Sequence, residues 1–256
     1  MRYTLSILIN YLLTISSYSQ AIDTIDITPQ NINVKNLMMG KHQYLVYYQD
    51  NIDGNKTGFE FWTRNVAIKD DGKRKVIEIA QYWENNDSIF HEAISRNDIA
   101  TFKPIYQRSW WKKKNVVFTN EFDFEKQLAL VRGKPLGQDT ASVSKATLHA
   151  FKEANEVYCL NWHLDLEVFS ILPLKDNTAY RINFYDPGFR NPPQKVVYTI
   201  EGSAKLKAYD NYEVDCWLLK YIGERHQEVF WISKKTHEVV KLEQQFDGKF
   251  RYKIKL

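Results

Sequence analysis

The densest group of side chains able to carry out chemistry is in the segment WHLDLE, residues 162–167. In an extended strand, His163, Asp165 and Glu167 would share one face, where they could hold a metal ion or act as a general acid and base. In a helix the three side chains would diverge, and Asp165 would suit the N-cap or the first turn. Because the residues that follow have helical character, the structural interpretation is favoured over a hydrolase.

The other histidines show no spacing typical of a metal site or a catalytic site. They are His42, His91, His149, His226 and His237. The sequence also lacks a G-x-S-x-G elbow, a glycine-rich phosphate loop and an H-E-x-x-H pair. Catalytic groups can meet in space without a fixed spacing, so these absences weaken an enzymatic function without excluding it. We predict a protein that is not an enzyme and that uses no metal and no cofactor.

Aromatic residues supply the candidate ligand contacts. They make up 14% of the chain, which favours β-rich packing. Several strand-like segments carry large apolar residues on both faces, and such strands need cover on both sides. That cover is either packed core or the wall of a half-barrel enclosing a hydrophobic cavity. The candidate ligand-binding residues are Trp62, Trp83, Phe90, Trp217 and Trp231.

The elements that position these residues are mainly strands, bounded by turn residues such as those at 70–72, 186–188 and 247–248. Helix-forming residues at 145–155 predict one helix, and 165–172 predicts a second that Pro173 ends. The predicted strands are 42–48, 58–64, 66–68, 76–83, 89–94, 102–111, 116–124, 127–131, 178–185, 195–202, 212–221, 228–233, 239–246 and 250–256.

These elements predict a mainly β (α+β) fold, namely a curved antiparallel sheet or half-open β-barrel wrapped around one or two helices. The C-terminal strands should complete one sheet begun near Lys41. The clearest alternation is at 250–256, where Phe250, Tyr252 and Ile254 share one face and the intervening cations share the other. We expect the apolar face to be buried and the cationic face to meet water.

The first residues predict secretion. Residues 1–20 combine a basic start, a short apolar stretch and a small-residue end, as in a signal peptide. The apolar stretch is too short for a membrane span, and no later stretch approaches that length, so no transmembrane segment is expected after cleavage. Residues 21–256 then form a single β-rich domain, secreted and, in a bacterium, periplasmic or associated with the outer membrane.

Two cysteines, Cys159 and Cys216, would meet an oxidising compartment if the chain is secreted. They are candidates for a disulfide, although both have apolar neighbours and free cysteine is also commonly buried.

The net charge of +4 is small and spread along the chain, so no nucleic-acid partner is expected. The one compact basic run, at 112–114, is interpreted as a solvated hairpin tip.

Two segments carry a resemblance to a known group of proteins: LNWHLDLEVFSILP at 160–173 and YRINFYDPG at 180–188. Together with 214–219 and 229–233, they resemble a bacterial secreted family of unknown function, which is similar to the half-barrel superfamily of the lipoprotein localisation factors. The resemblance implies a curved sheet wrapped around helices, a concave apolar surface suited to acyl chains, and an envelope location. It brings no catalytic residues. This chain has no cysteine near the signal-peptide end to accept a lipid anchor.

Three functional hypotheses follow. The favoured one is a non-enzymatic periplasmic binding or carrier protein for a lipid or other apolar ligand. The second is a structural or interaction module for envelope assembly, in which the apolar surface is packed core and the exposed sheet edge or aromatic rim binds protein or glycan. The third, a hydrolase, needs His163, Asp165 and Glu167 close together and exposed in a cleft.

Overall fold

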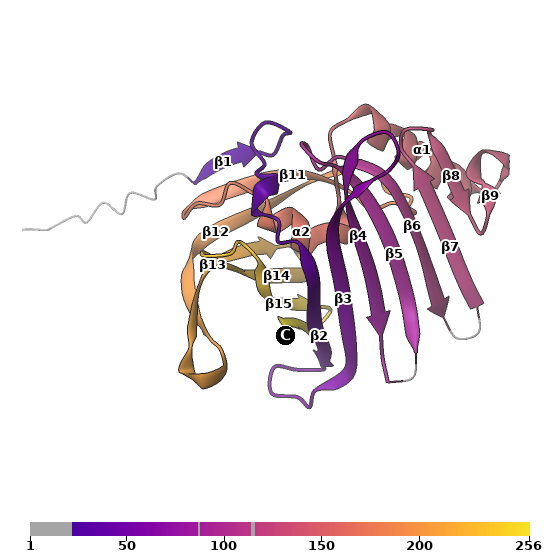
Figure 1. Ribbon diagram of the computed structural model, residues 1–256. Coiled ribbons are helices and arrows are strands. Elements are labelled where there is room, and N and C mark those ends of the chain that lie inside the picture. Colours follow the sequence, from indigo (N-terminus) through magenta and orange to yellow (C-terminus); the bar gives the residue numbers. More distant parts are fainter. Residues whose placement is uncertain (1–21, 87, 114–115) are drawn as a thin grey trace, which may run out of the picture.

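The computed structural model describes residues 22–86, 88–113 and 116–256, so the predicted signal peptide at 1–20 lies outside the described residues. One 16-stranded sheet forms the frame, in the order β1-β11-β12-β13-β14-β15-β16-β2-β3-β4-β5-β6-β7-β8-β9, with β10 paired to β11 (Figure 1). The strands are β1 (Asp23–Asp26), β2 (Gly40–Gln49), β3 (Thr57–Asp70), β4 (Lys75–Glu84), β5 (Ile89–Asp98), β6 (Pro104–Lys113), β7 (Val116–Asp123), β8 (Leu128–Val131), β9 (Lys134–Pro135), β10 (Leu160–Asn161), β11 (Thr178–Tyr185), β12 (Gln194–Lys207), β13 (Glu213–Ile222), β14 (His226–Ser233), β15 (Val239–Phe246) and β16 (Lys249–Lys255).

Strand β16 joins the two parts of the chain. It pairs antiparallel with β15 on one side and with β2 on the other, where Lys253 lies opposite Val46. The prediction of one sheet begun near Lys41 and completed by the C-terminal strands is therefore confirmed. The sequence did not indicate the two parallel pairings, in which β1 and β10 each run alongside β11.

The predicted helical insertion is confirmed as helix α1 (Ser142–Glu156) and helix α2 (Asp165–Ser170), the latter preceded by the 3-10 turn η3 (Trp162–Leu164). Three further 3-10 turns are η1 (Val34–Asn36), η2 (Leu136–Gln138) and η4 (Tyr209–Asn211). Helix α1 buries Ala150, Phe151 and Ala154, and Phe151 packs against Phe122 and Phe124 of the β7 region. The apolar spacing of the helix thus selects the face that meets the sheet.

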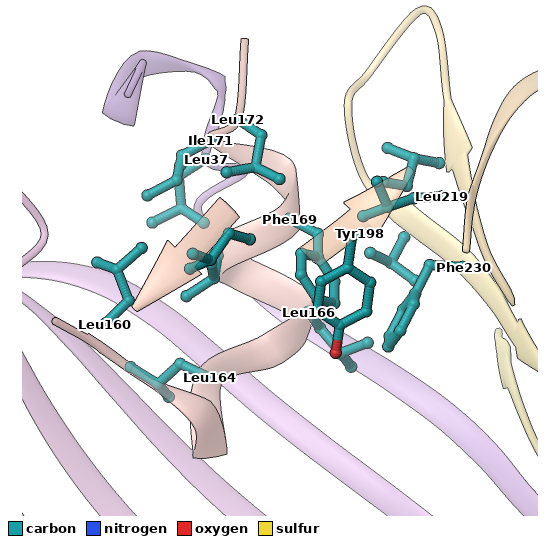
Figure 2. Packing of buried hydrophobic residues seen from close by; sticks show 14 of the residues in the cluster. Leu37, Leu160, Leu164, Leu166, Phe169, Ile171, Leu172, Tyr198, Leu219 and Phe230 are labelled. Atoms are coloured by element: carbon teal, nitrogen blue, oxygen red, sulfur yellow. The ribbon is translucent and has the colours of Figure 1, made fainter. Parts of the chain in front are cut away.

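Helix α2 lies inside the curve of the sheet, between the broad layer of β2 to β9 and the strands β11 to β15 (Figure 1). Its Phe169 ring lies 4.4 Å from the ring of Phe230 and 4.7 Å from that of Tyr198, while Leu166 and Leu219 belong to the same buried cluster (Figure 2). Such burial of large side chains is the main source of folding stability. The main core therefore lies around α2 and takes side chains from β2 to β4 as well as from β11 to β15.

The expected orientation of the last strand is wrong. On β16, Lys253 is only 3% exposed, while Tyr252 is half-buried and stacks on Tyr47. The inward orientation is stable because the Lys253 ammonium lies 3.3 Å from an Asp165 carboxylate oxygen and 4.4 Å from the Trp62 ring centre. The alternation of residues separated the two faces of β16 correctly, but the face that carries Lys253 is the one that points into the concave interior.

Both cysteines are buried and free. Cys159 belongs to the cluster under α1, whereas Cys216 is on β13, and each thiol has a backbone carbonyl nearby, at Ala154 and Val214 respectively. Burial raises the pKa of Cys159 to about 12 and that of Cys216 to about 11, so both thiols stay protonated at neutral pH. The structure does not join the two disulfide candidates.

Within the described residues, no helix has the length and apolar character needed to cross a membrane.

Candidate functional site

A cavity of about 510 Å³ opens on the concave face beside the filled core. Strands β4, β6, β7 and β16, the turn η3 and the loop after β11 all contribute to its wall. The lining residues are Trp83, Gln107, Ser109, Trp111, Lys113, Phe118, Asn120, His163, Asp186, Pro187, Gly188, Phe189 and Arg251. Its volume is in the range of small-molecule binding pockets, roughly 300–1,000 Å³.

The inner row of β6 supplies one side of this cavity. Alternate residues of a strand share a face, so Gln107, Ser109, Trp111 and Lys113 follow one another along the wall. Gln107 and Ser109 are 3% and 6% exposed, Trp111 is half-buried and Lys113 is exposed, which sets a direction from floor to mouth.

Strand β7 lies beside β6 and lines the cavity from floor to mouth in the same order, with a polar residue first and an aromatic residue after it. Asn120 is paired with Ser109, and Phe118 is paired with Trp111. The cavity therefore has a polar pair near its floor and an aromatic pair nearer its mouth, with Lys113 at the rim.

The loop after β11 forms the opposite wall and depends on a glycine. Gly188 has φ of +102°, and a Cβ atom there would lie 3.2 Å from the Asn120 amide nitrogen and 3.5 Å from the Phe122 ring. Any other residue would be strained in this conformation and would crowd β7. Gly188 thus lets the loop lie close to β7 while Phe189, 60% exposed, stands at the opening.

Several polar side chains of the cavity have no partner within the described part of the chain, and the buried indole nitrogen of Trp83 is among these unpaired groups. Ser109, Asn120 and Asp186 make no side-chain hydrogen bond or ion pair there, although all three line the cavity. Desolvation, with a smaller contribution from Asp165, raises the pKa of Asp186 to about 7. Polar groups withdrawn from bulk water and left unpaired are the groups that a ligand can satisfy.

A pair of neutral histidines fixes the hydrogen-bonding character of the floor. His91 Nδ1 lies 2.8 Å from the Trp110 carbonyl oxygen, which can only accept, so Nδ1 carries the proton. His91 Nε2 must then accept a hydrogen bond from His163 Nε2, 2.9 Å away. That assignment leaves His163 Nδ1 unprotonated and able to accept.

Burial keeps both rings neutral. It lowers the pKa of His91 to about 4 and lowers that of His163 well below its usual value, with further lowering at His163 from His91 and Arg64. The acceptor at His163 Nδ1 is therefore present throughout the neutral pH range.

Stacked rings form the wall beside the histidines. Trp83 stacks on Trp62 with 3.6 Å between ring centres and meets Trp111 edge to face at 5.1 Å. The His91 ring stacks on Trp111 at 3.7 Å. These contacts restrict the rotation of Trp83 and Trp111, the two tryptophans that line the cavity.

A buried ion pair holds η3 and α2 on the sheet. Arg64 of β3 donates from Nε to Glu167 Oε1 at 2.7 Å and from Nη1 to Gln81 Oε1 at 2.9 Å, and its Nη2 also pairs with Glu167 Oε2. Arg64 Nη2 donates as well to the backbone carbonyl of His163, as does Gln81 Nε2. The network positions His163 at the cavity.

The trio required by the hydrolase hypothesis does not assemble. His163 bonds to His91, Asp165 pairs with Lys253, and Glu167 pairs with Arg64. The cause is the one anticipated for a helical conformation, because η3 and α2 point the three side chains in different directions. Among the described residues, no group of three or more His, Cys, Asp or Glu side chains is placed to hold a metal ion.

The five aromatic residues predicted to bind ligand are not brought together. Trp83 lines the cavity, Trp62 stacks behind it, and Phe90 touches Trp83 at 6.4 Å between ring centres. Trp217 packs against the main core. Trp231 lies on the face of β14 opposite Phe230 and Ile232, which belong to that core.

The sequence argument missed most of the cavity wall. Ser109 and Trp111 lie in QRSWWKK, residues 107–113, where both faces mix polar and aromatic residues, so alternation gives no signal. Asp186 and Gly188 lie in a segment interpreted only as a turn. The sequence feature that could have indicated this wall is an aspartate and a glycine directly after a buried strand, because a loop that begins there can fold back over the sheet.

The fold and the cavity together define a class: proteins with a curved open sheet, a helical insertion inside the curve and a mixed polar and aromatic cavity beside it. The chain belongs to the family described as "Protein of unknown function (DUF3108)", whose model matches residues 43–255. No curated protein matches the chain.

Two solved structures are similar to this chain. One is a DUF1329 family protein from Desulfovibrio piger, with 11% identity, a TM-score of 0.31, and coverage of 87% of this chain and 85% of that one. The other is a β-barrel-like protein of the DUF1849 domain of unknown function from Brucella abortus, with 6% identity, a TM-score of 0.39, and coverage of 86% and 97%.

Proposed function

We propose that this protein is a non-enzymatic binding protein that holds a small ligand in the cavity between β6, β7 and the loop after β11. The observation that carries the proposal is the cavity of about 510 Å³ into which three unpartnered polar side chains project, Ser109, Asn120 and Asp186. Packing alone does not account for an open, polar space directly beside a well-filled apolar core, because unpaired groups there reduce stability.

The cavity suits an amphipathic ligand better than a hydrocarbon chain. In a half-barrel of the lipoprotein localisation type, acyl chains would occupy an apolar concave face. Here helix α2 and its core occupy the apolar part of that face, and the remaining space has Ser109, Asn120 and His163 near its floor. A lipid tail would leave these groups without hydrogen bonds. A ligand with an apolar face and polar groups would satisfy both parts.

The proposal includes a location. Residues 1–20 have the pattern of a signal peptide, and we place the mature protein in the envelope of its host, where it would meet ligands from outside the cytoplasm. Fractionation of cells expressing the full chain, with N-terminal sequencing of the mature protein, tests this. A cytoplasmic protein that keeps its first 20 residues would contradict it.

Binding is tested by blocking the cavity. The mature chain is purified gently and examined by native mass spectrometry for reproducible co-purified mass, and the same measurement is made on Ser109→Trp, which fills the polar part of the cavity. The matched control is Arg108→Trp, on the same strand but on its exposed outer face. The bound mass should disappear from Ser109→Trp and remain in the control.

Circular dichroism and thermal unfolding establish that both variants are folded. Reproducible absence of bound mass in the wild-type protein, together with no uptake of amphipathic fluorescent probes, would contradict the proposal. It would favour the alternative of an interaction module without a ligand.

A further inference from the structure

The floor of the cavity presents both hydrogen-bond donors and acceptors. The Ser109 hydroxyl and the Asn120 amide each can donate and accept, whereas His163 Nδ1 only accepts. Gln107 Oε1 already accepts from Asn161 Nδ2 and from Ser95 Oγ, so its remaining function toward the cavity is that of an amide donor. Donors and acceptors therefore alternate over a small area.

This arrangement discriminates between kinds of polar ligand. A carboxylate or phosphate has only acceptor atoms, so it could pair with Arg251 and Lys113 but would leave the lone pair of His163 Nδ1 without a donor. An ammonium group has only donors and would face the cations of Arg251 and Lys113, which line the same cavity. A hydroxyl group both donates and accepts, so a set of neighbouring hydroxyls can satisfy every group of the floor.

Above this floor lies the aromatic pair. Trp111 and Phe118 are cross-strand neighbours, and Trp111 is held in place by the stacked His91 ring and by Trp83. A fixed aromatic surface next to a set of hydrogen-bonding groups fits a ring that has apolar C–H faces and hydroxylated edges. A pyranose sugar has this combination, because its axial C–H groups form the faces and its hydroxyls lie around the edge.

Resting on the proposed binding function, we infer that the ligand is a neutral saccharide. Its ring lies against Trp111 and Phe118, and its hydroxyls bond to Ser109, Asn120 and His163. Asp186, in the loop after β11, and Arg251, on β16, reach further hydroxyls from a carboxyl and a guanidinium group, both of which can form two hydrogen bonds at once.

The inference is tested with the full mature protein on an array of several hundred neutral and charged glycans, followed by titration of the strongest ligand by calorimetry. Neutral glycans should bind, and charged ones should not be preferred. Ser109→Ala and Asn120→Ala should each weaken binding by about tenfold, as expected for one lost hydrogen bond. Trp111→Leu should weaken it further, while Arg108→Ala, on the outer face, should leave affinity unchanged.

A fluorescent dodecanol probe, uncharged and amphipathic, is titrated in parallel and separates this inference from the proposed function. If the probe binds, Ser109→Trp abolishes its binding and no glycan binds, the saccharide inference is overturned and the binding function stands. If a carboxylated or phosphorylated glycan binds and its neutral counterpart does not, the inference is also overturned. If neither probe nor glycan binds and native mass spectrometry shows an empty protein, both fail.

Discussion

The two halves of the concave face belong to one sheet but differ in what covers them. Over β11 to β15, helix α2 inserts Leu166 and Phe169 into a closed apolar core with Tyr198 and Phe230. Between β6, β7 and the loop after β11, the side chains are polar and aromatic and surround an open cavity. The curvature of a sheet therefore provides concave space, and the side chains decide whether it becomes core or site.

The boundary between the halves is ionic. Two buried ion pairs, Arg64 with Glu167 and Lys253 with Asp165, join α2 to β3 and β16. Buried charges are stable only when they are paired. Each ion pair therefore holds α2 against the sheet. Substitutions in the core, at the boundary and in the cavity should therefore have effects of decreasing size on the free energy of unfolding.

The largest effect is expected in the filled half. Phe169→Ala removes a completely buried ring that contacts Phe230 and Tyr198, and it should reduce the free energy of unfolding by about 3–5 kcal/mol. Urea unfolding followed by tryptophan fluorescence measures this. The same change at Phe189, exposed at the cavity mouth, should cost less than about 0.5 kcal/mol. Equal losses at both positions would mean that the halves are packed alike.

At the boundary, Glu167→Gln should cost about 3 kcal/mol, because it leaves the Arg64 guanidinium buried without its counter-charge. The control is Glu153→Gln on α1, where an exposed glutamate lies near an exposed His149 and little change is expected. A cost at Glu167 as small as that at Glu153 would show that the ion pair does not hold the insertion in place.

In the cavity, Asp186→Asn should stabilise the protein in a pH-dependent way. The folded-state pKa of about 7 lies above the ordinary value of 3.8, so the folded protein holds this proton more tightly. The contribution of the wild-type carboxyl to stability is then fully present below pH 4 and is lost as the pH rises through 7.

The asparagine variant stays neutral, so it should exceed the wild type by on the order of 2 kcal/mol at pH 8, with the difference vanishing toward pH 4. Denaturant unfolding at a series of pH values measures this difference. A constant difference across the series would contradict the assignment of the titration to Asp186.

The smallest effect on stability is expected for Ser109→Ala. The hydroxyl has no partner among the described residues, so its removal should change the free energy of unfolding by less than about 0.5 kcal/mol. Ligand affinity should nevertheless fall by about tenfold. A large loss of stability at this position would indicate that the cavity floor is ordinary core.

The sequence predicted the frame of this molecule better than its site. Strand runs and the helical character of 145–155 and 165–172 are local signals, and the structure confirms them, although α2 ends at Ser170, before Pro173. The trio at 163–167 was correctly interpreted as helical, which excluded the geometry that a hydrolase needs.

The remaining features depend on contacts between distant segments. Alternation showed that Lys253 and Tyr252 lie on opposite faces, but only the position of Asp165, 88 residues earlier, turns the lysine inward. Trp217 and Trp231 look like Trp83 in sequence, but Trp217 packs against the main core and Trp231 lies on the face of β14 opposite the core residues Phe230 and Ile232. Ser109 and Asp186 meet across the cavity through the order of the strands, which no local pattern contains.

The central place of β16 has a consequence for the order of folding. Until residues 249–255 have been synthesised, β2 and β15 have no partner between them, and the two parts of the sheet cannot join. Contacts between β16 and β2 span about 200 residues of chain, and pairings of such long range are slow to form. During that interval both unpaired edges can pair with other chains. The pairing of β16 with β2 is therefore expected to be a late and slow step in the folding of this sheet.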